Sequence, residues 1–378
     1  MSPKSPRRSR PERERGQILV VFALGLITMI GGVALVIDAG LAYAQQRGTQ
    51  NGSDAAANAG AVVLAQRLGG ATKTDADVAS AVTFSAGVNQ ITQTAYYTNV
   101  TGQPIDFSGN AVAPASAAAV GNGTNTIPPN AQGVHVGGLR TFGTTFARVI
   151  GIPTLTTGAE ATAVTGKLIG GAFLPVIFPV NITDCAGNGN LGLPKDQWPI
   201  SQPGAEGQHP VGTEYIVPLC KTGGGSFQIL DLDGTKNNCD EEVTNPPPIQ
   251  WDTFPVNVAT DNGNNCAKKM VDEVNARHGQ VVMIPICDTN DCNTSGGSHA
   301  VYHVSGVTAF YIDYMVDSNK KDGLCSSHTN ADGQVLTDIG GNGSSSCLAG
   351  WFIHFITKGP VGSGAIGNGD SIGIQLIK

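Results

Sequence analysis

The hydrophobic pattern begins with an uninterrupted apolar run. Residues 18–37 carry no charged side chain, and the only hydroxyl among them is that of Thr28. A helix rises about 1.5 Å per residue, so this run spans about 30 Å, the thickness of a bilayer core. The pattern therefore predicts a transmembrane helix over residues 16–38.

Two alternatives for this run are a cleaved signal peptide and a buried core helix. Ala42 and Ala44 are small enough for a cleavage site, but a signal peptide has an apolar region of only about 7–15 residues, and Asp38 intervenes. A core helix is disfavoured because the flank before the run is strongly basic. We therefore expect a retained anchor.

Helical periodicity continues beyond the apolar run. Residues 39–68 keep apolar side chains at roughly helical spacing, which predicts that the membrane helix extends outward as one rod. Gly48 and Gly52 each cost a helix about 1 kcal/mol relative to alanine and make a kink plausible. A second helix is predicted over residues 75–88, with Thr74 as its N-cap.

The C-terminal half has the pattern of short strands. Segments rich in Val, Ile, Phe and Tyr alternate with clusters of Gly, Asn and Pro. The predicted strands cover residues 174–180, 214–219, 227–230, 280–286, 301–314 and 351–357. A β-rich domain over residues 169–378 follows from this pattern.

Composition supports this division. Charged residues make up 13% of the chain, about half the usual share, and 51 glycines suit short strands joined by many turns. We predict an α+β protein in which a long N-terminal transmembrane helix extends into an exported α/β region. That region covers residues 39–168, and a β-rich, disulfide-stapled domain over residues 169–378 follows it.

The charges are distributed unevenly along the chain. Residues 1–15 hold six cations and two anions, whereas 16 cations and 26 anions follow Asp38. Basic residues flanking a membrane helix stay on the cytoplasmic side, so residues 1–15 should form a cytoplasmic tail and the C-terminus should be extracytoplasmic. The acidic main body argues against nucleic-acid binding, which needs a basic face.

Several motifs around the predicted anchor point to a known family. They are Arg15-Gly16-Gln17, Val36-Ile37-Asp38-Ala39-Gly40, Tyr43, Gln50-Asn51, Asp54-Ala55-Ala56-Ala57, Ala59-Gly60-Ala61, Gly133-Val134-His135-Val136, Thr144-Thr145-Phe146-Ala147-Arg148-Val149-Ile150-Gly151 and residues 159–164. Together they resemble the TadE/TadG-like family of membrane-anchored proteins of the bacterial Flp-type tight-adherence pilus machinery. The resemblance implies a strand, a short helix containing the Phe-Ala-Arg stretch, and a second strand.

The chain departs from related patterns at two points. Pilins cut by a prepilin peptidase carry a glutamate five residues after the cleavage glycine, and after Gly16 this position is Val21. The Asp-x-Ser-x-Ser metal motif of von Willebrand A domains, which longer TadG-like proteins carry, does not occur. These departures favour a retained anchor and give no support to metal-dependent adhesion.

The cysteines are confined to the predicted outer part. They are Cys185, Cys220, Cys239, Cys266, Cys287, Cys292, Cys325 and Cys347. An even number on the exported side favours disulfides, although eight cysteines allow roughly a hundred pairings. Cys287 with Cys292 and Cys325 with Cys347 are the pairs that sequence proximity suggests. No Cys-x-x-Cys spacing supports a zinc site.

Candidate chemistry is sparse. Asp231-x-Asp233-Gly234 hints at a calcium loop but lacks the EF-hand ligand at Thr235, so a strand-ending turn is the preferred interpretation. His299 and His303 would share a helix face, but the surrounding residues favour a strand, which separates them by about 13 Å. No Gly-x-Ser-x-Gly elbow or phosphate loop occurs. We predict no catalytic residue, metal, cofactor or small-molecule substrate.

The anchor itself offers a packing surface. Gly25, Gly31, Gly32 and Ala34 are small enough to let another helix approach closely in the membrane. Asp38 at the outer end suits either hydration at the membrane interface or a contact with another helix. The predicted partners are the bilayer and other pilus or pseudopilin subunits.

These observations favour a non-enzymatic, single-pass protein of the bacterial cell membrane that acts in pilus assembly or as a minor pilin-like subunit. One alternative is a membrane-tethered surface adhesin or binding module independent of a pilus. Another is a tethered exported hydrolase, which would need a pocket with a nucleophile beside a base.

Overall fold

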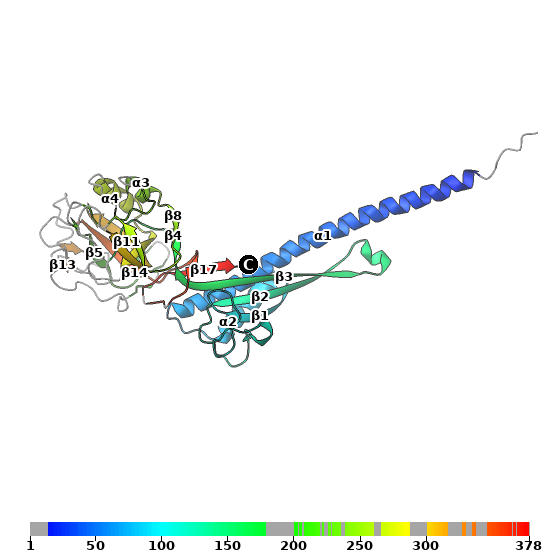
Figure 1. Ribbon diagram of the computed structural model, residues 1–378, viewed down its shortest axis with the longest axis horizontal. Helices are drawn as coiled ribbons and strands as arrows, with labels where there is room; N and C mark the ends of the chain where they lie inside the picture. Colours follow the sequence, from blue (N-terminus) through cyan, green and yellow to red (C-terminus); the bar gives the residue numbers. More distant parts are fainter. Residues whose placement is uncertain are drawn as a thin grey trace, which may run out of the picture.

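The fold is described from a computed structural model. It describes residues 14–178, 200–202, 204–205, 208–219, 221–222, 226–227, 229–235, 239–260, 266–287, 301–316, 327–329, 335–337, 346–364, 366–367 and 369–377. A long helix leads into a first sheet, and a second β-rich unit lies at the far end of that sheet (Figure 1).

The long helix α1 (Glu14–Leu68) contains 55 residues, and only its C-terminal half packs against the sheet (Figure 1). It passes through Gly48 and Gly52 as one continuous helix, so the predicted rod is confirmed. The glycines allow close contacts. A Cβ at position 48 would lie 2.7 Å from the Arg140 side chain, and one at position 52 would lie 3.0 Å from Ile91.

The first sheet has the order β1 (Thr92–Thr98), β2 (Gly133–Gly143), β3 (Thr154–Leu168), β17 (Ile372–Ile377) and β15 (Ile356–Lys358), and β16 (Val361–Gly362) pairs with β3. All pairs are antiparallel except β15 with β17. The turn η2 (Ala147–Ile150) joins β2 to β3, and η1 (Pro114–Ser116) lies between β1 and β2. The predicted strand, short helix and strand are thus present.

Helix α2 (Asp75–Val88) covers the sheet together with α1. Its N-cap is Thr74, as the sequence predicted, and the structure adds a capping box between Thr74 and Asp77. Alanines of α1 allow close packing, and the shared core includes Ala57, Leu64, Val82 and Val134. This core holds the C-terminal half of α1 on the sheet.

The C-terminal strands correct the expected domain boundary. Sequence analysis placed all of residues 169–378 in the second domain, but β15, β16 and β17 belong to the first sheet. Ile372 and Ile374 are buried in the core that α1 and α2 share. β17 is held in the first sheet by hydrogen bonds to β3 and by the burial of these two isoleucines, so the C-terminal end of the chain belongs to the first sheet.

The second unit contains a five-stranded antiparallel sheet. Its order is β10 (Val281–Cys287), β11 (Val301–Val316), β14 (Ser346–Ile353) and β5 (Tyr215–Leu219), and β9 (Val256–Ala259) pairs with the start of β11. Helices α3 (Cys239–Thr244) and α4 (Cys266–Ala276) share a buried core with this sheet. Phe178, Phe310 and Phe352 meet edge to face in its core. Short pairs complete the unit: β4 (Gly170–Ala172) with β8 (Pro248–Gln250), β6 (Lys221–Thr222) with β7 (Ser226–Phe227), and β12 (Ser327–Thr329) with β13 (Val335–Thr337).

The strand predictions for this unit succeed in part. Those over residues 214–219, 280–286 and 301–314 are confirmed as β5, β10 and β11. The prediction over residues 351–357 is wrong, because β14 ends at Ile353 and β15 begins at Ile356 in the other sheet. Within residues 174–178 and 229–230 the structure has isolated bridges, such as Val176 with Ile229.

Two of the eight cysteines have described side chains. Cys287 and Cys347 are buried, and both are disulfide-bonded. The side chains of the other six cysteines lie outside the described residues. The pairings suggested by the sequence, and the stapling of the whole domain, stay predictions.

Candidate membrane anchor and its junction with the outer domain

The N-terminal half of α1 is an isolated apolar helix. Its large side chains are uncovered within the described structure, with Phe22 70% and Met29 74% exposed. It contains one stretch long and apolar enough to cross a membrane, judged by length and composition. Thr28 Oγ1 donates to the Leu24 carbonyl at 2.8 Å, so the hydroxyl of this stretch is satisfied within the helix.

The glycines predicted to pack against other helices lie open. A Cβ placed at Gly25, Gly31 or Gly32 would meet no described atom within 4 Å. Gly25 and Gly32 are two helical turns apart and share one face, whereas Ala34 is half-buried and points to another side. A partner helix can therefore approach closely along the face that carries Gly25 and Gly32.

Asp38 ends the apolar run and is only 6% exposed. Its carboxylate accepts hydrogen bonds from the backbone N–H groups of Thr145 at 2.8 Å, Phe146 at 3.0 Å and Ala147 at 2.5 Å. Successive backbone N–H groups form a concave anion site. Asp38 therefore joins the anchor to the turn between β2 and β3, a role that the sequence analysis did not consider.

The turn that Asp38 binds is itself well defined. Thr144 donates through Oγ1 to the Ile152 carbonyl at 2.5 Å, and its N–H donates to Pro153. Gly151 has φ +89°, which ends η2 in a left-handed conformation that favours glycine. Val149 is 84% exposed and Ile152 is 45% exposed, so apolar side chains surround the point where the apolar run ends.

A row of polar side chains continues the junction along α1. Gln46 Nε2 donates to the Gly158 carbonyl at 2.7 Å, and Gln50 Nε2 donates to that of Glu160 at 3.1 Å. The remaining members are Thr49, bonded to Thr157, and Ser53, bonded to Ala159. We call Gln46, Thr49, Gln50 and Ser53 the polar seam. Their spacing places all four on one helix face, a signal that could have predicted the seam.

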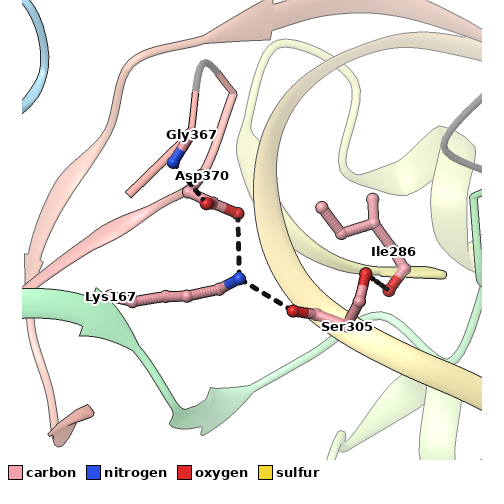
Figure 2. A network of polar contacts seen from close by, with 5 residues as sticks. All are labelled: Lys167, Ile286, Ser305, Gly367 and Asp370. Atoms are coloured by element: carbon pink, nitrogen blue, oxygen red, sulfur yellow. Dashed lines mark hydrogen bonds and ion pairs between the residues drawn. The ribbon is translucent and has the colours of Figure 1, made fainter. Parts of the chain in front are cut away.

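A buried ion pair joins the first sheet to the second unit (Figure 2). Lys167 Nζ in β3 lies 3.5 Å from Asp370 Oδ1 and donates to the Ser305 carbonyl of β11 at 2.7 Å. Asp370 also accepts the N–H of Gly367 at 2.8 Å. These residues are far apart in sequence, so no local pattern could have brought them together.

The other sequence candidates are distributed over the second unit. His303 lies in β11 opposite Asn257, on a strand as the sequence favoured, and His299 is outside the described residues. Asp231 and Asp233 lie in the turn after Leu230, where the structure adds Glu242 to them. The sequence analysis missed this glutamate.

A pocket of about 360 Å³ lies between Leu168, Leu174, Met283 and Phe355. Among the described residues that line it there is no Ser, Cys, His, Asp or Glu. Thr357 supplies a hydroxyl to this lining, but it donates to the Lys358 carbonyl at 3.4 Å, so the described lining shows no hydroxyl or thiol paired with an imidazole or carboxylate base.

Comparison with known protein families gives a match in the N-terminal part of the chain. Residues 16–63 match the model of the Tad family, of TadE/G-like Flp pilus-assembly proteins. The matched segment covers the apolar run, Asp38 and the polar seam, and it confirms the resemblance seen in the sequence. No curated protein and no solved structure matches the chain.

Proposed function

We propose that this protein is a non-enzymatic, membrane-anchored component of a Flp-type pilus system that packs through its N-terminal helix against other pilus or pseudopilin subunits. The observation that carries the proposal is the uncovered apolar half of α1, whose open glycine face leads directly to the Asp38 junction. The match of residues 16–63 to the Tad family supports a pilus-related role.

The anchor suits lateral association inside a bilayer. Lipid tails are as apolar as leucine, so helices associate in membranes through close van der Waals packing at small residues. Gly25 and Gly32 leave room for such a contact. No described atom lies within 4 Å of either Cβ position, so a partner helix can approach the backbone there. The basic residues before the run keep the N-terminus cytoplasmic in this proposal, with the acidic body outside.

Because α1 is fixed to the first sheet, packing of its membrane half would also affect the part of the protein outside the membrane. α1 is one continuous helix, and its outer half is held on the first sheet by Asp38, by the polar seam and by an alanine-rich core. Packing the membrane half against a neighbouring subunit would therefore fix the orientation of the outer domain. A flexible tether would leave that orientation free.

The test is co-isolation of pilus subunits from membranes of the native host. Full-length protein with a C-terminal tag is solubilised in mild detergent and captured, and bound Flp-type subunits are quantified. Gly32→Leu should reduce their recovery at least tenfold, because the added side chain prevents close approach. Ala23→Leu is the matched control, since it places the same leucine side chain on the opposite face and should leave recovery unchanged.

Membrane insertion is checked in parallel by carbonate extraction, which both variants should resist. Recovery of pilus subunits by Gly32→Leu at the wild-type level would contradict the proposed packing face. Failure of the wild-type protein to capture any pilus subunit would contradict the proposed role.

A further inference from the structure

Three carboxylates from two segments meet in the second unit. Asp231 and Asp233 lie in the turn after Leu230, and Glu242 lies in α3. One oxygen of each lies within 4.8 Å of the oxygens of the other two. Asp231 is 8% exposed and Glu242 is 1% exposed, whereas Asp233 is open to solvent.

The turn wraps around the Glu242 side chain. Glu242 Oε1 accepts the backbone N–H groups of Leu232 at 2.7 Å and Asp233 at 2.9 Å. Asp231 Oδ1 accepts the N–H of Gly234 at 2.7 Å, and Gly234 adopts φ +80°. These bonds fix the backbone of the turn and direct its two aspartates toward α3.

The second oxygen of Glu242 supplies an independent observation. Glu242 Oε2 is fully buried and has no hydrogen-bond partner among the described residues. A buried carboxylate oxygen without a partner is unfavourable, and more so beside two other carboxylates.

We propose that Asp231, Asp233 and Glu242 bind one Ca²⁺ ion. Every candidate ligand atom is a hard carboxylate oxygen, which Ca²⁺ and Mg²⁺ prefer. Ca²⁺ tolerates irregular geometry and a bidentate glutamate, whereas Mg²⁺ demands a near-ideal octahedron. The exposed side chain of Asp233 gives the ion a route from solvent and leaves room for coordinated water.

The ion would link the turn to α3. Val243, beside the ligand Glu242, is buried with Met270 and Val274 of α4. Neutralising the three carboxylates would therefore stabilise the packing of both short helices on the second sheet. This role is independent of how the anchor packs in the membrane.

The test uses full-length protein in detergent, treated with EGTA and then titrated calorimetrically with CaCl₂ or MgCl₂. We expect one Ca²⁺ per chain, with a dissociation constant of about 10⁻⁴–10⁻³ M, the range of extracellular calcium modules. Ca²⁺ should also raise the melting temperature, and Mg²⁺ should bind at least tenfold more weakly.

Asp233→Asn and Glu242→Gln should each weaken Ca²⁺ binding at least tenfold. Asp233 is exposed, so its variant should fold even where Glu242→Gln does not, and circular dichroism checks this. Glu241→Gln is the matched control, because Glu241 is an exposed neighbour in the same helix outside the cluster. Absence of Ca²⁺ binding in the wild type, wild-type affinity in Asp233→Asn, or equal affinity for Mg²⁺ would each overturn the assignment.

Discussion

The carboxylate of Asp38 accepts the backbone N–H of Thr145 at 2.8 Å, across 107 positions of sequence. This bond joins the end of the apolar run to the turn between β2 and β3. The turn is thereby fixed beside the point where α1 would leave the bilayer. The apolar half of α1 and the first sheet are thus joined by a specific contact in addition to the continuous backbone.

Replacing Asp38 with alanine should loosen this turn. Three backbone N–H groups, of Thr145, Phe146 and Ala147, would lose their acceptor. Cleavage of detergent-solubilised protein near residues 144–153 by a protease should become roughly tenfold faster, a factor consistent with losing a hydrogen bond to a charged group. Asp252→Ala, at an exposed position, is the control and should keep the wild-type rate.

The polar seam should contribute measurably to holding α1 on β3. Replacing Gln46 and Gln50 with alanine removes their bonds to the carbonyls of Gly158 and Glu160. Each lost bond should lower the free energy of unfolding by about 0.5–1.5 kcal/mol, measured by urea denaturation in detergent. Gln45→Ala is the matched control on the same helix, and an equal loss there would argue against the seam.

His135, which lies in β2, should make the first sheet less stable in mild acid. Burial lowers its pKa, and the nearby Glu160 opposes this only in part. Its ring stacks on Tyr96 with centroids 4.5 Å apart, and Nδ1 lies 2.8 Å from Thr162 Oγ1. Below the unfolded pKa of about 6.5, the unfolded chain binds more protons than the folded one, so stability falls as the pH falls.

The measurement is the free energy of unfolding at pH 7.5 and pH 5.5. His135→Gln should reduce the difference between the two values, because glutamine does not titrate. Burial also lowers the pKa of His354, so some pH dependence in the same direction should remain. An unchanged difference in the variant would exclude His135 as its source.

How much of this structure could be predicted depended on the range of the interactions. The apolar run, the helix over residues 75–88 and its Thr74 cap follow from local spacing, and the structure has all of them. The alternation of Ile372 and Ile374 with Gly373 and Gln375 would have indicated a strand. Nothing local, however, could have paired it with β3, some 200 residues earlier.

The same reasoning applies to the candidate sites. Asp231 and Asp233 are recognisable as a possible cation loop, but the third carboxylate comes from α3. The EF-hand pattern considers ligands within one loop only, so it could not identify a cluster whose third carboxylate lies in α3. From the sequence, Asp38 was expected to contact water at the membrane interface or another helix. Its actual partners are backbone N–H groups, which carry no sequence signature.

Lys167 and Asp370 should couple the first sheet to the second unit. The Lys167 side chain is 13% exposed and that of Asp370 is 1% exposed. Lys167→Met would leave a buried carboxylate without its ion-pair partner, and breaking a buried pair in this way costs about 3–5 kcal/mol. The free energy of unfolding by urea should fall by about that amount. Lys358→Met, at an exposed lysine of β15, is the control and should be nearly neutral.

The double variant Lys167→Met with Asp370→Asn distinguishes two contributions to the lost stability. One is the loss of the ion pair itself, and the other is the burial of the Asp370 charge without Lys167. Asparagine carries no charge, and its carbonyl can still accept the N–H of Gly367, which lies 2.8 Å from Asp370 Oδ2 (Figure 2). The double variant should therefore be more stable than Lys167→Met alone, because the buried charge has been removed. A double variant less stable than Lys167→Met would mean that the Asp370 carboxylate stabilises the fold through contacts other than Lys167, such as the Gly367 N–H.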